Sequence, residues 1–296
     1  MSTAGQRSTA SSRGHDAGGV AAAGPHLLSH QPQWPLPGLK PGPAGDNQRQ
    51  PLCGNRAPTG GVTTTSSLSA IRATLAEMTG SDSSSGRSLM DFDALYRGES
   101  PGEGIPPMTT PPWDTKAPKE NVIGWHAGGW VHGDVLDIGC GLGDNAVYLA
   151  KNGYQVTGLD ISPTALITAE RRAKDAGVEV RFAVADSTQL EGYTDEFDTV
   201  VDSGMFHCLD DDGKRSYAAA AHRATRPGAT LLISCFSDAN SDDDERPLPV
   251  VSEQTLRDVL GGAGWDIETI EPATVRREED GTEIEMAFWY VRAQRR

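Results

Sequence analysis

From Asp91 to the C-terminus, short apolar runs alternate with segments in which apolar residues recur every three or four positions. Runs rich in Val, Ile and Leu are typical of buried strands, and the longer spacing is typical of amphipathic helices. The pattern predicts seven strands, at residues 135–139, 154–161, 178–186, 197–204, 229–236, 265–271 and 283–293. It predicts helices at residues 143–152, 163–176, 213–225 and 252–262. Ser162 and Pro163 are typical of the N-cap and the first position of the helix at 163–176.

This alternation predicts an α/β fold: a doubly wound, seven-stranded, mostly parallel, Rossmann-like sheet with helices on both faces. The last two strands follow each other without a helix between them, so the last strand is expected to be antiparallel. Ligands of such sheets bind beyond the carboxyl ends of the strands. The loop that follows the first strand, at 139–143, is therefore the expected place of a site.

The first 88 residues have a different composition, rich in Gly, Pro, Ser, Thr and Ala, with helical spacing only at 68–78. Such a segment cannot bury enough apolar surface to offset its chain entropy. It predicts a disordered low-complexity tail at 1–88 and one domain at 89–296. Met78 and Met90 each precede the globular pattern, so one hypothesis is that the native protein starts at one of them.

Charge and cysteine usage narrow the class of partner. The net charge is −15, yet the first 90 residues hold four acidic and seven basic residues, so the domain itself is strongly acidic. Because acidic surfaces repel phosphate backbones, we expect a small-molecule partner and no nucleic acid. No apolar stretch is typical of a membrane span or a secretory signal. The four cysteines are far apart without a C-x-x-C pair, which predicts reduced thiols in a cytoplasmic protein and no metal site, and the oligomeric state is left open.

The stretch DVLDIGCGLGDNAVYLA (134–150) carries glycines with the spacing G-x-G-x-G. A dinucleotide loop has G-x-G-x-x-G, and a P-loop has G-K-[ST] after its glycines. Here Asp144 stands at the position of the third dinucleotide glycine, and Asp137 lies two positions before the first glycine. Because acids beside a diphosphate are unfavourable, the loop predicts a cationic ligand without phosphate.

Two further acids end the next two predicted strands. Asp160 ends the second strand, where a carboxylate can accept both hydroxyls of a ribose, and Asp186 ends the third, where it can accept the amine of adenine. Together with the loop they predict an adenosine that carries an ammonium and a positive centre. S-adenosylmethionine fits that description and is the predicted cofactor. Taken singly, each acid could instead cap a helix or end a strand without a ligand.

Four stretches occur in order at the ends of successive predicted strands: DVLDIGCGLGDNAVYLA, VTGLDIS, FAVADST and FDTVVDSGMFHCLD. They resemble the motifs of class I S-adenosylmethionine-dependent methyltransferases over residues 118–292. The resemblance implies cofactor-binding roles for the following residues: Asp137, Gly139, Cys140, Gly141 and Gly143 around the methionine part, Asp160 and Ile161 at the ribose and adenine face, Asp186 and Ser187 at the adenine edge, and Asp202 and Ser203 at the methyl-donor end. Within this set, Asp137 either orders the loop or approaches the ammonium, and Cys140 is either a reactive thiol or a small residue that fits a tight turn.

Residues 91–122, with PPWD at 111–114, resemble the N-terminal region of thiopurine- and tellurite-type methyltransferases and of mycobacterial-type enzymes that methylate small heterocycles. The resemblance implies a lid segment, 91–130, that covers the cofactor and part of an acceptor pocket. The residues expected at the lid and pocket are Tyr96, Arg97, Trp113, Phe206 and His207. His207 is a candidate base, pocket wall or hydrogen-bond donor, and Asp202 is the second catalytic candidate.

The function expected from these features is methyl transfer from S-adenosylmethionine to an O, N or S atom of a small aromatic or heterocyclic molecule. Two alternatives stay open at this point. One is methylation of a quinone or lipid-like metabolite, and the other is a non-catalytic sensor that binds S-adenosylmethionine.

Overall fold

The computed structural model of the protein describes residues 90–102, 107, 110–240, 249–279 and 282–296. They belong to one compact unit, Val62–Arg296, and a second unit, Met1–Gly61, lies entirely outside them. The predicted tail at 1–88 and its helix at 68–78 also lie outside the described residues, so both stay predictions.

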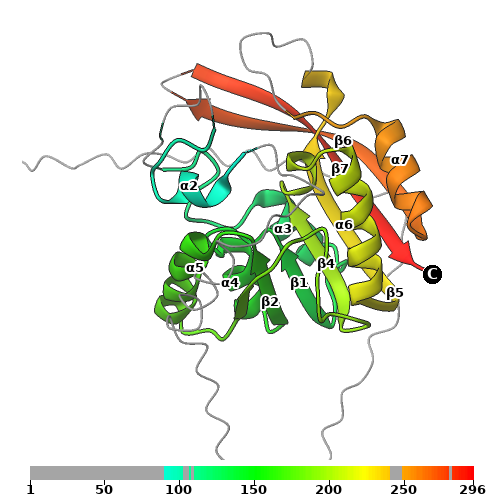
Figure 1. The fold of residues 1–296 in the computed structure, drawn as a ribbon, viewed down its shortest axis with the longest axis horizontal. Helices are drawn as coiled ribbons and strands as arrows, with labels where there is room; N and C mark the ends of the chain where they lie inside the picture. Colours follow the sequence, from blue (N-terminus) through cyan, green and yellow to red (C-terminus); the bar gives the residue numbers. More distant parts are fainter. Residues whose placement is uncertain (1–89, 103–106, 108–109, 241–248, 280–281) are drawn as a thin grey trace, which may run out of the picture. The chain divides into compact units, whose positions relative to one another are not determined.

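The described residues form helices and strands in the alternation that the sequence predicts (Figure 1). The strands are β1 (Asp134–Ile138), β2 (Gln155–Asp160), β3 (Arg181–Val184), β4 (Phe197–Ser203), β5 (Thr225–Phe236), β6 (Trp265–Glu279) and β7 (Thr282–Arg295). The helices are α2 (Phe92–Tyr96), α3 (Glu120–Ala127), α4 (Asp144–Lys151), α5 (Pro163–Ala176), α6 (Asp211–Ala224) and α7 (Glu253–Gly262), with short 3-10 helices η1 (Phe206–Cys208) and η2 (Asp238–Asn240).

The strands form one sheet in the order β3-β2-β1-β4-β5-β7-β6. β1 to β5 pair in parallel, whereas β7 pairs antiparallel with both β5 and β6. This confirms the doubly wound, mostly parallel sheet with an antiparallel last strand. The strand order reverses between β1 and β4, and ligands of such folds bind beyond the carboxyl ends of the strands at that switch point.

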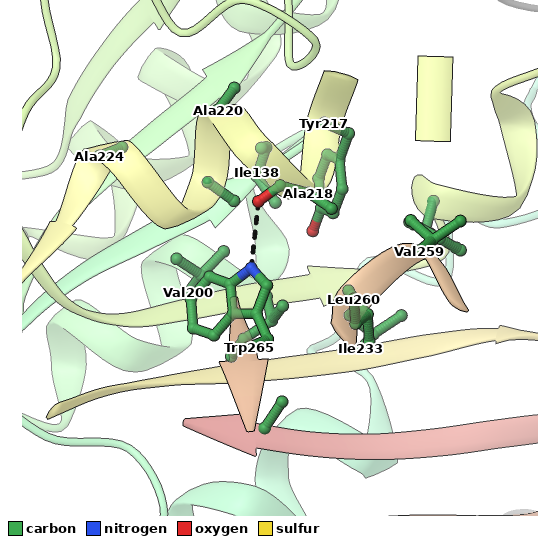
Figure 2. Close-up of a cluster of buried hydrophobic side chains, with 14 of the residues drawn as sticks. Ile138, Val200, Tyr217, Ala218, Ala220, Ala224, Ile233, Val259, Leu260 and Trp265 are labelled. Atoms are coloured by element: carbon green, nitrogen blue, oxygen red, sulfur yellow. Dashed lines mark hydrogen bonds between the residues drawn. The ribbon is translucent and has the colours of Figure 1, made fainter. Parts of the chain in front are cut away.

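Successive residues of the central strands point to opposite faces of the sheet and enter two separate cores. Leu136 and Val200 pack on the side of α6 and α7, whereas Val135 and Val201 pack on the side of α3, α4 and α5. Helices therefore cover both faces, as predicted. Figure 2 shows the first core, in which the Trp265 indole N–H donates to the Ala218 carbonyl of α6 at 3.0 Å. This bond fixes the start of β6 beneath α6.

Several predicted boundaries are wrong. α6 begins at Asp211 rather than 213, because the Asp210 carboxylate caps it by accepting from the Gly213 N–H at 2.7 Å. β5 follows α6 directly, β3 is shorter than predicted, and β6 continues eight residues past 271 because it pairs along its length with β7. Helices α2 and α3 were not predicted, since they are too short to show a hydrophobic period.

Candidate active site

The glycine loop between β1 and α4 holds backbone conformations that favour glycine. Gly139, Gly141 and Gly143 have φ of +68°, +52° and +84°. A Cβ at Gly139 would lie 2.5 Å from Met205 Cγ, and one at Gly141 would lie 2.9 Å from the Tyr96 hydroxyl. The missing side chains thus let the segment after β4 and helix α2 approach the loop closely.

Backbone hydrogen bonds attach this loop to β2. The N–H groups of Gly139 and Cys140 both donate to the Leu159 carbonyl, at 2.8 and 3.0 Å, and the Gly141 N–H donates to Asp160 Oδ2 at 2.7 Å. Cys140 is buried, and its Sγ packs 3.1 Å from the place a Cβ of Gly158 would take. Burial raises the pKa of the Cys140 thiol well above its usual value, so the structure supports the small-residue interpretation and not the reactive thiol.

Three aspartates are buried at the carboxyl ends of the neighbouring strands β1, β2 and β4. Burial, with the charges of Asp202 and Asp160, raises the pKa of Asp137 to about 7. Burial raises the pKa of Asp160 and of Asp202 to about 6 each. Within the described residues none of the three forms an ion pair with a Lys or Arg, and Asp137 Oδ2 has no hydrogen-bond partner. This end of the sheet therefore favours a cationic ligand.

Asp160 and Asp202 also organise the backbone around them. Asp160 Oδ1 accepts from the Ser162 N–H at 2.8 Å, in addition to the Gly141 bond. Asp202 Oδ1 accepts from three successive N–H groups after β4, those of Gly204, Met205 and Phe206, at 3.2, 2.8 and 3.3 Å. Asp202 Oδ2 faces the Tyr217 hydroxyl, which lowers its pKa somewhat, although the pair does not reach good hydrogen-bond geometry.

The residues predicted for the adenine lie on the same edge. Ile161 directly follows Asp160 and is 45% exposed, which is unusual for a large apolar side chain next to a buried carboxylate. Asp186 Oδ1 accepts from the N–H and hydroxyl of Thr188, at 2.8 and 2.6 Å, so it stabilises the turn after β3. The Ser187 hydroxyl donates to Met205 Sδ at 3.4 Å, which brings the β3 and β4 ends together.

Tyr96 and Trp113 come together above the glycine loop. The Trp113 indole N–H donates to the Tyr96 hydroxyl at 2.9 Å, and that hydroxyl is the group next to Gly141. Burial and the charge of Asp160 raise the pKa of Tyr96 well above its usual value. Arg97 is not part of this group, since its guanidinium pairs with Asp93 and Glu99 at the surface.

Two attachments hold this lid segment to the domain, and sequence reasoning missed both. Asp93 accepts from the Ser162 hydroxyl at 2.6 Å and from the Thr164 N–H at 3.0 Å, which joins α2 to the start of α5. Arg172 of α5 binds Asp114, next to Trp113, at 2.8 and 3.0 Å. It also binds Asp144, the first residue of α4, at 2.5 Å. The position of Asp144 after the glycines was the only sequence signal for this network.

His207 lies at the end of β4, as predicted, and is 7% exposed. Its Nδ1 accepts from the Phe236 N–H at 3.3 Å, and the two rings pack with centroids 4.4 Å apart. Burial and the charge of Lys214 lower the pKa of His207 to about 3. The imidazole is thus neutral, and because Nδ1 accepts, its proton is on Nε2, where it is a donor.

The remaining pocket candidates differ in their surroundings. Phe206 is fully buried against Tyr217, with ring centroids 5.4 Å apart, so it packs in the core rather than lining an open pocket. The Ser203 hydroxyl accepts from the Asn121 amide of α3 at 3.2 Å. Asn121 was not singled out from the sequence, because a lone polar residue before the first strand gives no pattern.

Two negative findings apply to the described residues alone. They contain no group of three or more His, Cys, Asp or Glu side chains that could hold a metal ion. Among the helices of the described ranges, none is both long and apolar enough to cross a membrane.

Comparisons with known proteins agree with this geometry. A family model described as a methyltransferase domain matches residues 135–228. The 2-heptyl-1-hydroxyquinolin-4(1H)-one methyltransferase of Mycobacteroides abscessus is 34% identical over 223 residues, which are 69% of this chain and 96% of the relative. A solved structure from work on conversion of a disulfide bond into a thioacetal group during echinomycin biosynthesis is 40% identical, with TM-score 0.60, covering 69% of this chain and 90% of that one. TehB from Haemophilus influenzae shares the fold at 21% identity and TM-score 0.51, over 62% of this chain and 64% of TehB.

The glycine loop, the buried acids at the strand ends and these relatives define a methyltransferase. The chain belongs to the class I S-adenosylmethionine-dependent methyltransferases, and S-adenosylmethionine is its cofactor. The resemblance predicted from the four sequence motifs is confirmed, and the alternative of a non-catalytic sensor is set aside.

Proposed function

We propose that the protein transfers the methyl group of S-adenosylmethionine to an O, N or S atom of a small aromatic or heterocyclic molecule. The observation that carries this proposal is the lid: Tyr96 and Trp113, bonded to each other, lie over the glycine loop. A lid of this kind shields a small acceptor from water. The Mycobacteroides abscessus relative, which is named for a heterocyclic acceptor, supports the same class.

The residues at the strand ends fit S-adenosylmethionine. Asp137 Oδ2 is a buried carboxylate oxygen without a partner, which an ammonium would satisfy. Each Asp160 oxygen accepts one backbone N–H and keeps a further lone pair for a ribose hydroxyl. Ile161 presents exposed apolar surface for the adenine. Asp186, Ser187 and Ser203 keep their proposed roles at the adenine edge and the methyl-donor end.

The bound cofactor supplies a methyl group on a positively charged sulfur, which an acceptor lone pair displaces in line. The chain's own residues align the two reactants and exclude water, and this can account for most of the acceleration. Tyr96 and Trp113 close the cofactor side through their mutual bond. His207 is neutral with its proton on Nε2, which supports a role as donor to the acceptor rather than as the base that removes its proton.

Other properties are proposed on weaker grounds. The net charge of −15 supports a small-molecule partner in place of nucleic acid. The described cysteines Cys140, Cys208 and Cys235 are all free thiols, which supports a reducing, cytoplasmic location.

The test begins with cofactor binding by the full chain. Isothermal titration with S-adenosylmethionine and S-adenosylhomocysteine should give saturable binding, while NADH, the control ligand, should not bind. Asp160→Ala should weaken binding about 10- to 100-fold, since hydrogen bonds to a charged group contribute about 1.5–3 kcal/mol. The exposed Asp175 supplies a matched variant, Asp175→Ala, which should bind as the wild type does.

Acceptors are then screened by mass spectrometry for a gain of one methyl group. The panel contains phenols, aromatic thiols, hydroxyquinolones and hydroquinones, so that it also tests the quinone alternative. Methylation of a phenol, thiol or quinolone supports the proposal. Cofactor binding with methylation of hydroquinones alone would favour the alternative, and absence of cofactor binding would contradict the site itself.

A further inference from the structure

Lys214 is a buried lysine at the acceptor end of the site. It lies in the first turns of α6, directly after η1, and the whole residue is 8% exposed. Side chains of a helix point back toward its N-terminus. In this fold that N-terminus lies at the carboxyl ends of β4 and β5, which is the edge that holds the site.

The ammonium of Lys214 has almost no partner in the protein. Its one ion pair among the described residues is to Asp211 Oδ1 at 3.7 Å, which exceeds hydrogen-bond distance. Asp211 has a side chain 81% exposed, so water screens its charge. A buried ammonium with three unused donors is costly to fold, and an added anion would satisfy it.

The charge of Lys214 acts on groups that face the acceptor end. It lowers the pKa of His207, and it opposes the rise that burial causes in the pKa of Cys208 and of Cys235. These groups come from η1 and from the end of β5, so the ammonium lies among them. The neutral His207 adds a second donor, its Nε2–H.

Lys214 is not the counter-ion of the nearest buried acid. Asp202 is held by three backbone N–H groups and faces Tyr217, and it forms no ion pair within the described chain. A purely structural role therefore does not account for a lysine in this place.

We propose that Lys214 binds the negative charge of the acceptor, and that the acceptor is an acidic aromatic or heterocyclic hydroxyl compound bound as its oxyanion. This inference rests on the proposed function and names its substrate class. The acceptor loses its proton to solvent before it binds, so no protein base is required. The oxyanion supplies the electron pair of the new C–O bond, the methyl C–S bond breaks with its pair left on sulfur, and S-adenosylhomocysteine leaves as a neutral thioether.

The first experiment measures the ionisation of a bound acceptor analogue. 4-Nitrophenol absorbs visible light as the phenolate and not as the phenol, so its spectrum reports the charge state. It is titrated with pH in the presence of the full chain saturated with S-adenosylhomocysteine. We expect binding to lower the pKa of nitrophenol by about one unit or more, which is a tenfold preference for the anion.

The variants separate charge recognition from a structural role. Lys214→Met keeps the length and removes the charge, and Lys214→Gln is a second choice should the first not fold. Arg215→Met is the matched control, because Arg215 is the next residue of α6 and pairs with Asp212 at the surface. We expect both Lys214 variants to lose the shift and the control to keep it. A wild type without a shift, or a Lys214 variant that keeps it, would overturn the proposal.

Steady-state kinetics give an independent readout. With acidic phenols, Lys214→Met should raise the acceptor KM about tenfold or more, while the KM for S-adenosylmethionine stays unchanged. Its melting temperature should not fall, since removal of an unpaired buried charge is neutral or stabilising. Undiminished methylation of acidic phenols by Lys214→Met would refute only the role of Lys214. Absence of cofactor binding in the wild type would refute the proposed function.

Discussion

The affinity for S-adenosylmethionine should fall as the pH decreases from 7 to 5, because the carboxylates that receive the cofactor hold protons in the free protein. Burial and neighbouring negative charges raise the pKa of Asp137 to about 7 and that of Asp160 to about 6. A bound cation favours the charged carboxylate and lowers these pKa values. The complex therefore holds fewer protons than the free protein, and binding is strong above pH 7 and is lost below it.

The pKa of Asp137 sets the magnitude. One proton displaced on binding changes the affinity about tenfold per pH unit, or about 1.4 kcal/mol, below that pKa. Between pH 7 and pH 6 we expect about a tenfold loss. Below pH 6 the loss should become steeper, because Asp160 and Asp202, each with a pKa of about 6, then hold protons as well.

Isothermal titration between pH 5 and 8 measures both the affinity and the protons released. At pH 6, titrations in buffers of different ionisation enthalpy should show release of about one proton per cofactor, since a group with a pKa near 7 is mostly protonated there. In Asp137→Asn the affinity should be lower at pH 8 and nearly constant from pH 8 to 6.5.

Asp137→Asn should also melt at a higher temperature than the wild type at pH 8 without cofactor, because it removes a buried charge whose partner is absent. Asp175→Asn, at an exposed position, should match the wild type in both assays. A wild-type affinity that is constant from pH 8 to 5, or an equal slope in Asp137→Asn, would refute the reasoning.

Three further predictions concern the lid, the loop and the acceptor end. Arg172→Met should lower stability by about 1–3 kcal/mol by leaving Asp114 unpaired, and should speed cofactor release in stopped-flow measurements, whereas the exposed neighbour variant Arg171→Met should do neither. Gly143→Ala should cost about 2–4 kcal/mol in urea unfolding, since its Cβ would lie 2.8 Å from that of Ala169 at a φ of +84°. Gly177→Ala, at a φ of +69° but with open space, should cost only about 1–2 kcal/mol. His207→Ala should lower kcat far more than cofactor affinity and His207→Gln, which keeps a donor, should lower it less. Equal losses in kcat and affinity would contradict a role at the acceptor.

The sequence by itself determined the layer structure and the cofactor edge. Buried strands and amphipathic helices show as hydrophobic periods over a few residues, so the sheet, its winding and the antiparallel last strand were all predictable. The glycine spacing and the acids at 137 and 160 are equally local, because a tight turn after a strand needs glycine and a strand end places the next side chain at the sheet edge. These features led to S-adenosylmethionine before any fold was known.

Only the tertiary structure decided how the lid and the acceptor end are built. Arg172 meets Asp114 across 58 positions of chain, and Tyr96 meets Trp113 across 17, so no periodic pattern records either contact. The burial of Lys214 and the proton position on His207 depend on what packs around each side chain. Charges and tautomers respond to their complete three-dimensional surroundings, which a run of neighbouring letters does not contain.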